Sequence, residues 1–294
     1  MEPASQTHLS AKEGADTVVN NHRLRRGMYI LPSLFTVGTL VCGYYAILMT
    51  LQGTQLMAAG VIGALVSAAF DRAATAIGLA ILFDGLDGRI ARLTNSTSNF
   101  GREFDSLADV ITFGLAPGLL AYSWGVRPAI DASQLPWTHH LRAAGWIVTF
   151  AYLICGAARL ARFNIDSTHP GADRRYFFGL PIPAAAGVIA AVVHWEKYPL
   201  THWLTSLAWL LAVLILAFLM VSRVRYYSFK GLDLRRRRPY VTIIFIGLII
   251  WAIAFYSELM LLILALTYAL SGVFHEISTR SRPNPRVPKE AKAQ

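Results

Sequence analysis

The sequence predicts an all-α protein, a polytopic bundle of about eight transmembrane helices. Charged residues make up only 15% of the 294 residues and hydrophobic residues 55%, whereas a soluble domain usually carries about 25% charged residues. Apolar stretches recur along the chain after Met28, and several approach the roughly 20 residues that cross a bilayer as a helix. Positive charges gather between these stretches, which is typical of a protein with several spans.

The apolar stretches set the expected spans. We predict one transmembrane domain over residues 28–276, between polar tails at 1–27 and 277–294. Both tails have the composition of disordered segments, and the second is rich in proline and basic residues. The expected spans are 29–50, 72–92, 104–124, 143–163, 180–195, 202–222, 239–256 and 258–275.

The segments between these spans alternate in charge, and this alternation predicts the orientation of the chain. Of the 27 lysine and arginine residues, all but Arg72, Arg127, Arg142 and Lys197 fall on one side. Cytoplasmic loops carry the basic excess in membrane proteins, so we expect that side and both termini in the cytoplasm, with the chain in the inner (cytoplasmic) membrane. The basic residues that give the net charge of +10 then lie beside anionic lipid headgroups, so we expect no nucleic-acid partner.

The segment 55–70 does not fit this pattern. It is apolar but only 16 residues long, and Asp71 and Arg72 follow it directly. As a ninth span it would move every later loop to the other side and invert the charge alternation. We therefore expect a re-entrant or interfacial helix, or an extension of the second span.

Four aspartates lie where apolar stretches meet polar sequence. Asp84 and Asp87 are three residues apart, and Asp105 and Asp109 are four apart, so each pair shares one face of a helix. An ionised aspartate in the centre of a span costs about 2.5–3.5 kcal/mol, and four together would repel one another. A hard divalent cation with oxygen ligands, such as Mg²⁺, Mn²⁺ or Ca²⁺, fits this set best. The simpler alternatives are solvated helix ends and ion pairs with neighbouring arginines.

The same stretch resembles the signature of the CDP-alcohol phosphotransferases, DxxDGxxAR followed by GxxxDxxxD. The resemblance implies the fold of that family and its reaction, in which an alcohol attacks a CDP-linked donor and CMP leaves. The matching residues are Asp84-Gly-Leu-Asp87-Gly88-Arg-Ile-Ala91-Arg92, then eight further residues, then Gly101-Arg-Glu-Phe-Asp105-Ser-Leu-Ala-Asp109.

The resemblance also implies roles for single residues. The four aspartates would hold two divalent ions, Mg²⁺ or Mn²⁺, and Asp109 would also remove the proton of the attacking hydroxyl. A Pro-x-x-x-Thr element near the start of the first span would line the nucleotide pocket, with Ser33 where many members have asparagine. The residues implied to bind the donor are Ser33, Thr36, Gly88, Arg92 and Ser98.

The stretches 156–164, 177–187 and 219–240 are similar to those of membrane-integral phosphatidylserine synthases. This resemblance implies CDP-diacylglycerol as donor and L-serine as acceptor in phospholipid biosynthesis, and a homodimer in the membrane. Arg159 and Arg162 are candidates for binding the carboxylate of serine, and Asn164 is a candidate for a further hydrogen bond. For either arginine the alternative is a topological or lipid-headgroup role.

Two other functions stay open at this point. Within the family, the acceptor could be glycerol 3-phosphate, inositol phosphate or another alcohol. From a different class, the aspartates could form the ion pathway of a cation transporter, because acidic residues inside spans mark such pathways. The acids gather near one face, however, and we find no inverted repeat and no second acidic set across the membrane.

Overall fold

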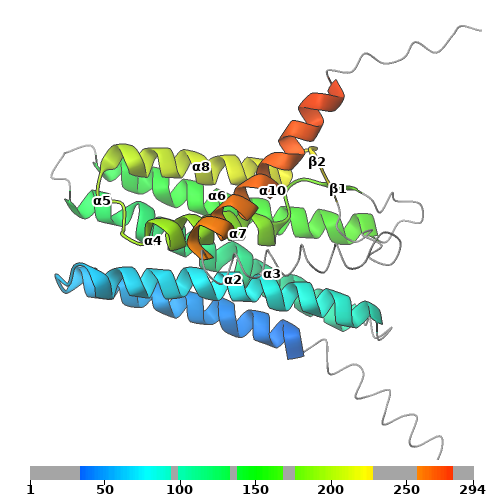
Figure 1. The fold of residues 1–294 in the computed structure, drawn as a ribbon, viewed down its shortest axis with the longest axis horizontal. Helices are drawn as coiled ribbons and strands as arrows, with labels where there is room; N and C mark the ends of the chain where they lie inside the picture. Colours follow the sequence, from blue (N-terminus) through cyan, green and yellow to red (C-terminus); the bar gives the residue numbers. More distant parts are fainter. Residues whose placement is uncertain (1–33, 94–98, 133–137, 168–175, 228–256, 281–294) are drawn as a thin grey trace, which may run out of the picture.

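The computed structural model describes residues 34–93, 99–132, 138–167, 176–227 and 257–280, and within these ranges it is almost entirely helical (Figure 1). Two short strands add a small antiparallel sheet. The helices and strands, in chain order, are an N-terminal helix at Leu34–Ala58, then α2 (Ala64–Leu93), α3 (Asn99–Asp109), the π-helix η1 (Val110–Leu115), α4 (Ala116–Gly125), α5 (Arg127–Ala132), α6 (Thr138–Ser167), β1 (Tyr176–Phe178), α7 (Ile182–Glu196), α8 (Trp203–Val221), β2 (Arg225–Tyr227) and α10 (Ser257–Arg280).

The helices form a layered bundle with α7 at its centre. The N-terminal helix and α2 lie along one side of the bundle and α6 and α8 along the other, while α10 crosses obliquely (Figure 1). Helix α7 packs against both α2 and α10, and α6 packs against α8. Residues on all sides of α7 are buried, among them the consecutive Val188, Ile189, Ala190 and Ala191, as expected for a helix that is apolar all round.

The all-α membrane fold is confirmed. Five helices are long and apolar enough to cross a bilayer, at Leu34–Ala58, Ala64–Ile90, Asn99–Ala132, His139–Ile165 and Trp203–Val221, and two shorter apolar helices lie at Ile182–Glu196 and Ser257–Gly272. Each expected span that falls on described residues overlaps one of these helices. The expected span 239–256 and most of both tails lie outside the described residues. The total of eight spans therefore stays a prediction.

The segment 55–70 contains a turn between two spans rather than a helix of its own. The first helix continues to Ala58 and the second begins at Ala64. Gly60 has a φ of 75°, and its N–H donates to the carbonyl of Met57 while the N–H of Val61 donates to that of Leu56. This pair of hydrogen bonds around a left-handed glycine is a Schellman motif, which ends the first helix. Residues 64–70 extend the second span, one of the expected alternatives.

A polar cluster joins three helices at the end of α2 that is remote from Asp84. His194 of α7 contacts Asp71 of α2 through Nδ1 at 2.5 Å and Ser257 of α10 through Nε2 at 3.3 Å. Lys197, which follows α7, forms an ion pair with Glu258 of α10. Asp71 precedes Asp84 by thirteen residues, or about 20 Å along the helix. The cluster therefore fixes α2, α7 and α10 to one another far from the candidate site.

Close packing of α4 on α8 depends on Gly125. The indoles of Trp124 and Trp209 meet edge to face with ring centroids 5.4 Å apart, and Trp209 Nε1 donates to the carbonyl of Ala121 at 3.0 Å. A Cβ added at Gly125 would overlap the indole of Trp209. Glycine at this position therefore lets the two helices approach each other.

We expect Gly125→Ala to destabilise the fold by about 1–3 kcal/mol, because overpacking a filled core displaces its neighbours. The measurement is thermal unfolding of the detergent-solubilised protein. The control is Gly78→Ala in α2, where an added Cβ meets nothing within 4 Å and stability should be kept or raised. A Gly125→Ala variant that unfolds at or above the wild-type temperature would contradict this packing.

Candidate active site

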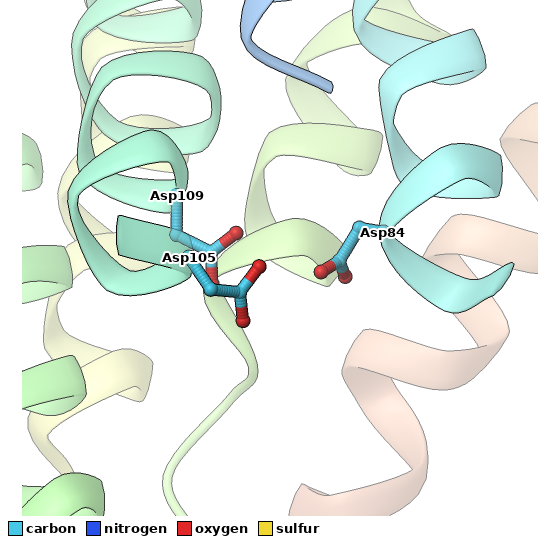
Figure 2. A group of neighbouring side chains, drawn as sticks. All are labelled: Asp84, Asp105 and Asp109. Carbon is cyan, nitrogen blue, oxygen red and sulfur yellow. The ribbon is translucent and has the colours of Figure 1, made fainter. Parts of the chain in front are cut away.

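Three carboxylates from two helices meet at one end of the bundle. Asp84 extends from α2, and Asp105 and Asp109 extend from the facing side of α3 (Figure 2). One carboxylate oxygen from each lies within 4.8 Å of the others. Only five residues, 94–98, separate α2 from α3, and the four-residue spacing of Asp105 and Asp109 puts both on one face of α3. The structure therefore brings three of the four predicted carboxylates together.

Asp87 lies beside this three-carboxylate group but has a partner of its own. It is 6% exposed, and the hydroxyl of Thr36 in the N-terminal helix donates a hydrogen bond to its carboxylate. Its charge still acts on both Asp105 and Asp109. Thr36, predicted from the resemblance to line the donor pocket, is thus placed directly at the acidic cluster.

Asp109 is the most enclosed member of the group. Its side chain is 8% exposed, and its Oδ1 is one of three buried polar side-chain atoms without a hydrogen-bond partner in the described part of the chain. A second is Nε of Arg159 in α6, and the charges of Asp109 and Arg159 attract each other. Buried polar atoms are nearly always satisfied. An acidic oxygen and a basic nitrogen, both buried and unsatisfied, are suited to a ligand that contacts both.

The chemistry of the donor set fits a divalent cation. All three members of the group offer carboxylate oxygens, the ligands preferred by Mg²⁺ and Mn²⁺. Neighbouring carboxylates repel one another unless a cation or protons compensate them. The unpartnered Oδ1 of Asp109 is free of the competing hydrogen bonds that would hold it away from an ion.

The remaining predicted residues are placed to different degrees. Gly88 lies one turn after Asp84 on α2 and is exposed, and Arg92 lies in the last turn of that helix, its side chain beyond the described part. Asn164 of α6 donates to the hydroxyl of Ser106 at 2.9 Å, which ties α6 to α3 next to Asp105. Arg162 is exposed on α6, and Ser33 and Ser98 lie outside the described residues.

Two tyrosines near the site were not predicted. Tyr268 of α10 lies close enough to Arg159 for the two side chains to interact electrostatically, and its ring centroid is 5.9 Å from that of Tyr226. Tyr152 of α6 is fully buried and contacts the helix that carries Asp109. Both sit in apolar stretches of the sequence, where a tyrosine carries no signal that separates a site residue from a core residue.

Comparison with known proteins agrees with this geometry. The family model described as CDP-alcohol phosphatidyltransferase matches residues 29–214, which include all four aspartates. A Helicobacter pylori protein called CDP-diacylglycerol–serine O-phosphatidyltransferase is 36% identical over 223 residues, or 76% of this chain and 82% of the relative. A Bacillus subtilis protein of the same name is 31% identical over 203 residues, which cover 69% of this chain and 93% of the relative. A Mycobacterium leprae protein of the same name is 29% identical over 246 residues, which cover 82% of this chain and 72% of the relative. The chain belongs to the CDP-alcohol phosphatidyltransferase family.

Proposed function

We propose that this protein transfers the phosphatidyl group from CDP-diacylglycerol to the hydroxyl of L-serine, giving phosphatidylserine and CMP. The observation that carries the proposal is the group formed by Asp84, Asp105 and Asp109, with the buried, unsatisfied Oδ1 of Asp109 and Nε of Arg159 beside it. Family membership supports the type of reaction, and the names of the relatives support the donor and the acceptor.

Asp84, Asp105 and Asp109 would hold the divalent cations, Mg²⁺ or Mn²⁺, and Asp87 would complete a set for two ions. Bound there, the ions would neutralise the pyrophosphate of the donor and stabilise the charge that develops on the departing CMP. Asp87 already accepts a hydrogen bond from Thr36, so its carboxylate is oriented before any ligand arrives.

Asp109 is proposed as the general base. The hydroxyl oxygen of serine attacks the phosphorus that carries the diacylglycerol ester, the bond from that phosphorus to the CMP oxygen breaks, and Asp109 accepts the hydroxyl proton. A base must lie within hydrogen-bonding reach of the proton that it removes. Oδ1 of Asp109 is suited to this role because no protein donor occupies it.

Arg159 is proposed to bind the carboxylate of serine. Its guanidinium belongs to α6 and attracts Asp109 of α3 without a direct ion pair. L-serine has a hydroxyl at one end and a carboxylate at the other, so one molecule can contact Asp109 and Arg159 together. Asn164, held by Ser106, and Arg162 are proposed as additional contacts to the acceptor.

The donor nucleotide is proposed to contact Ser33, Thr36, Gly88, Arg92 and Ser98. The site would open at the cytoplasmic face of the inner membrane, where the donor's acyl chains stay among the lipids. Residues 28–276 would form the transmembrane catalytic domain, with cytoplasmic tails at 1–27 and 277–294. We also propose a homodimer, as the family resemblance implies.

The central test is acceptor-dependent release of CMP from CDP-diacylglycerol by the purified protein with Mg²⁺ or Mn²⁺. We expect release with L-serine and none with glycerol 3-phosphate or inositol phosphate. Asp109→Asn should lower the rate by about 10²–10⁴-fold, the usual contribution of a general base, and removal of the metal with EDTA should abolish it.

The matched control is Asp131→Asn, an exposed carboxylate on α5 that pairs with Arg127 one turn earlier, which should retain wild-type turnover. Release with glycerol 3-phosphate but not with serine would reject the proposed acceptor. Cation transport without any CMP release would reject the enzyme.

A second prediction concerns the acceptor alone. Arg159→Gln should raise KM for serine by about 10–100-fold, because a charge-assisted hydrogen bond to a carboxylate contributes about 1.5–3 kcal/mol. KM for CDP-diacylglycerol should change little. Steady-state kinetics with each substrate varied in turn gives both values.

Arg142→Gln is the control for this substitution, since Arg142 is an exposed arginine near the opposite end of α6. Its KM for serine should match that of the wild type. An Arg159→Gln variant with unchanged KM for serine would show that the carboxylate binds elsewhere.

A further inference from the structure

Directly after Asp109 the helix widens. Residues Val110–Leu115 form the π-helix η1, before α4 resumes α-helical geometry. Within η1 each N–H reaches back five residues rather than four, as the hydrogen bond from the N–H of Ala116 to the carbonyl of Ile111 illustrates. The wide turn accommodates one extra residue, so the segments on its two sides are rotated by about 100° relative to an uninterrupted α-helix. Its geometry therefore sets which way Asp109 faces.

Pro117 explains why the turn widens at this position. It occupies the second residue of α4, so it has no N–H to donate to the carbonyl of Phe113, its partner in a regular α-helix. A proline ring inside a helix also clashes with the carbonyl four residues before it. The Phe113 carbonyl therefore cannot accept the N–H that a regular α-helix would offer it.

Tyr152 of α6 provides the replacement donor. Its hydroxyl donates to the carbonyl of Phe113 at 3.0 Å, and its side chain is 0% exposed. Phe113 is one helical turn after Asp109 in the chain. The hydrogen bond therefore attaches the wide turn to α6, the helix that also carries Arg159.

The N-terminal helix holds the wide turn from a second direction. The hydroxyl of Thr112 donates to the carbonyl of Thr39 at 3.2 Å, and Thr112 is 0% exposed. A Cβ added at Gly43 would come within 2.8 Å of Cα and Cβ of Thr112, so this glycine permits the close approach. Two neighbouring helices thus fix η1 through contacts to Thr112 and to the Phe113 carbonyl, not to the carboxylates.

We propose that Tyr152 is a positioning residue for Asp109, an inference that rests on the proposed function of this site. Its hydroxyl, bonded to the Phe113 carbonyl, holds η1 in its wide form and so directs the Asp109 carboxylate toward Asp84 and the acceptor. Tyr152 contacts neither substrate. Its loss acts through the orientation of Asp109, and a displacement of about 1 Å at a reacting group can cost about 10²-fold in rate.

The test is Tyr152→Phe, which removes the hydroxyl and keeps the ring. We expect kcat to fall about 10–100-fold, with KM for serine and for CDP-diacylglycerol changed less than about threefold. The matched control is Tyr226→Phe. Tyr226 is also fully buried, and its hydroxyl also donates to a backbone carbonyl, that of Ala269 in α10, at 3.0 Å. The Tyr226→Phe variant should lose about as much thermal stability as Tyr152→Phe and keep kcat within about twofold of the wild-type value.

Pro117→Ala separates positioning from stability. It restores an N–H at the fourth residue after Phe113 and removes the clash, so the chain can form a regular α-turn and rotate Asp109. Stability should be kept or raised while kcat falls. Equal losses of kcat in Tyr152→Phe and Tyr226→Phe, or full activity in Pro117→Ala, would overturn the proposal.

Binding of Mn²⁺, followed by electron paramagnetic resonance without any substrate, distinguishes this inference from the proposed function. We expect Tyr152→Phe to weaken Mn²⁺ binding at least threefold, with no change in Tyr226→Phe. That result would support the positioning role even if the wild-type protein released no CMP with serine. Unchanged Mn²⁺ binding together with unchanged kcat would reject the role while leaving the proposed function intact.

Discussion

Mutual repulsion among Asp84, Asp105 and Asp109 is the constraint on which the arrangement of this end of the bundle depends. Two unit charges about 5 Å apart repel by about 3 kcal/mol at an effective dielectric constant of about 20, and the three carboxylates lie within 4.8 Å of one another. The fold must hold them together against this force. It does so by placing them on helices whose positions are fixed by apolar packing and by hydrogen bonds between helices.

The compensating contacts come from several helices. Thr36 on the N-terminal helix binds Asp87, Arg159 on α6 faces Asp109, and Tyr152 on α6 holds the turn that follows Asp109. At the far end of α2, the cluster of Asp71, His194 and Ser257 fixes the same helix to α7 and α10. Helix α2 is therefore held by contacts near both of its ends, which suits a site that must bind ions in a defined geometry.

Much of this site could be predicted from the sequence because helical periodicity is a local property. Spacings of three and four residues were enough to place Asp105 and Asp109 on one face and to expect Asp84 opposite them. The alternation of charge was likewise enough to reject a ninth span at 55–70, where the structure has a Schellman turn at Gly60. These predictions required no knowledge of which helices touch.

The unpredicted features depend on contacts between distant parts of the chain. The hydroxyl of Tyr152 reaches a carbonyl 39 residues away, and Asn164 reaches Ser106 across 58 residues. Pro117 was visible in the sequence, but a proline in an apolar stretch predicts a kink or a helix end as readily as a π-turn. The pairing of β1 with β2, Tyr176 opposite Tyr227, joins two polar connections whose sequences carry no strong alternation.

The most direct measurement of the central claim is the position of Mn²⁺ in crystals of the protein, located by its anomalous scattering. The account predicts a manganese peak among the carboxylates of Asp84, Asp105 and Asp109, reduced or lost in crystals of Asp109→Asn. A manganese site elsewhere in the molecule, with none among these three carboxylates, would contradict it.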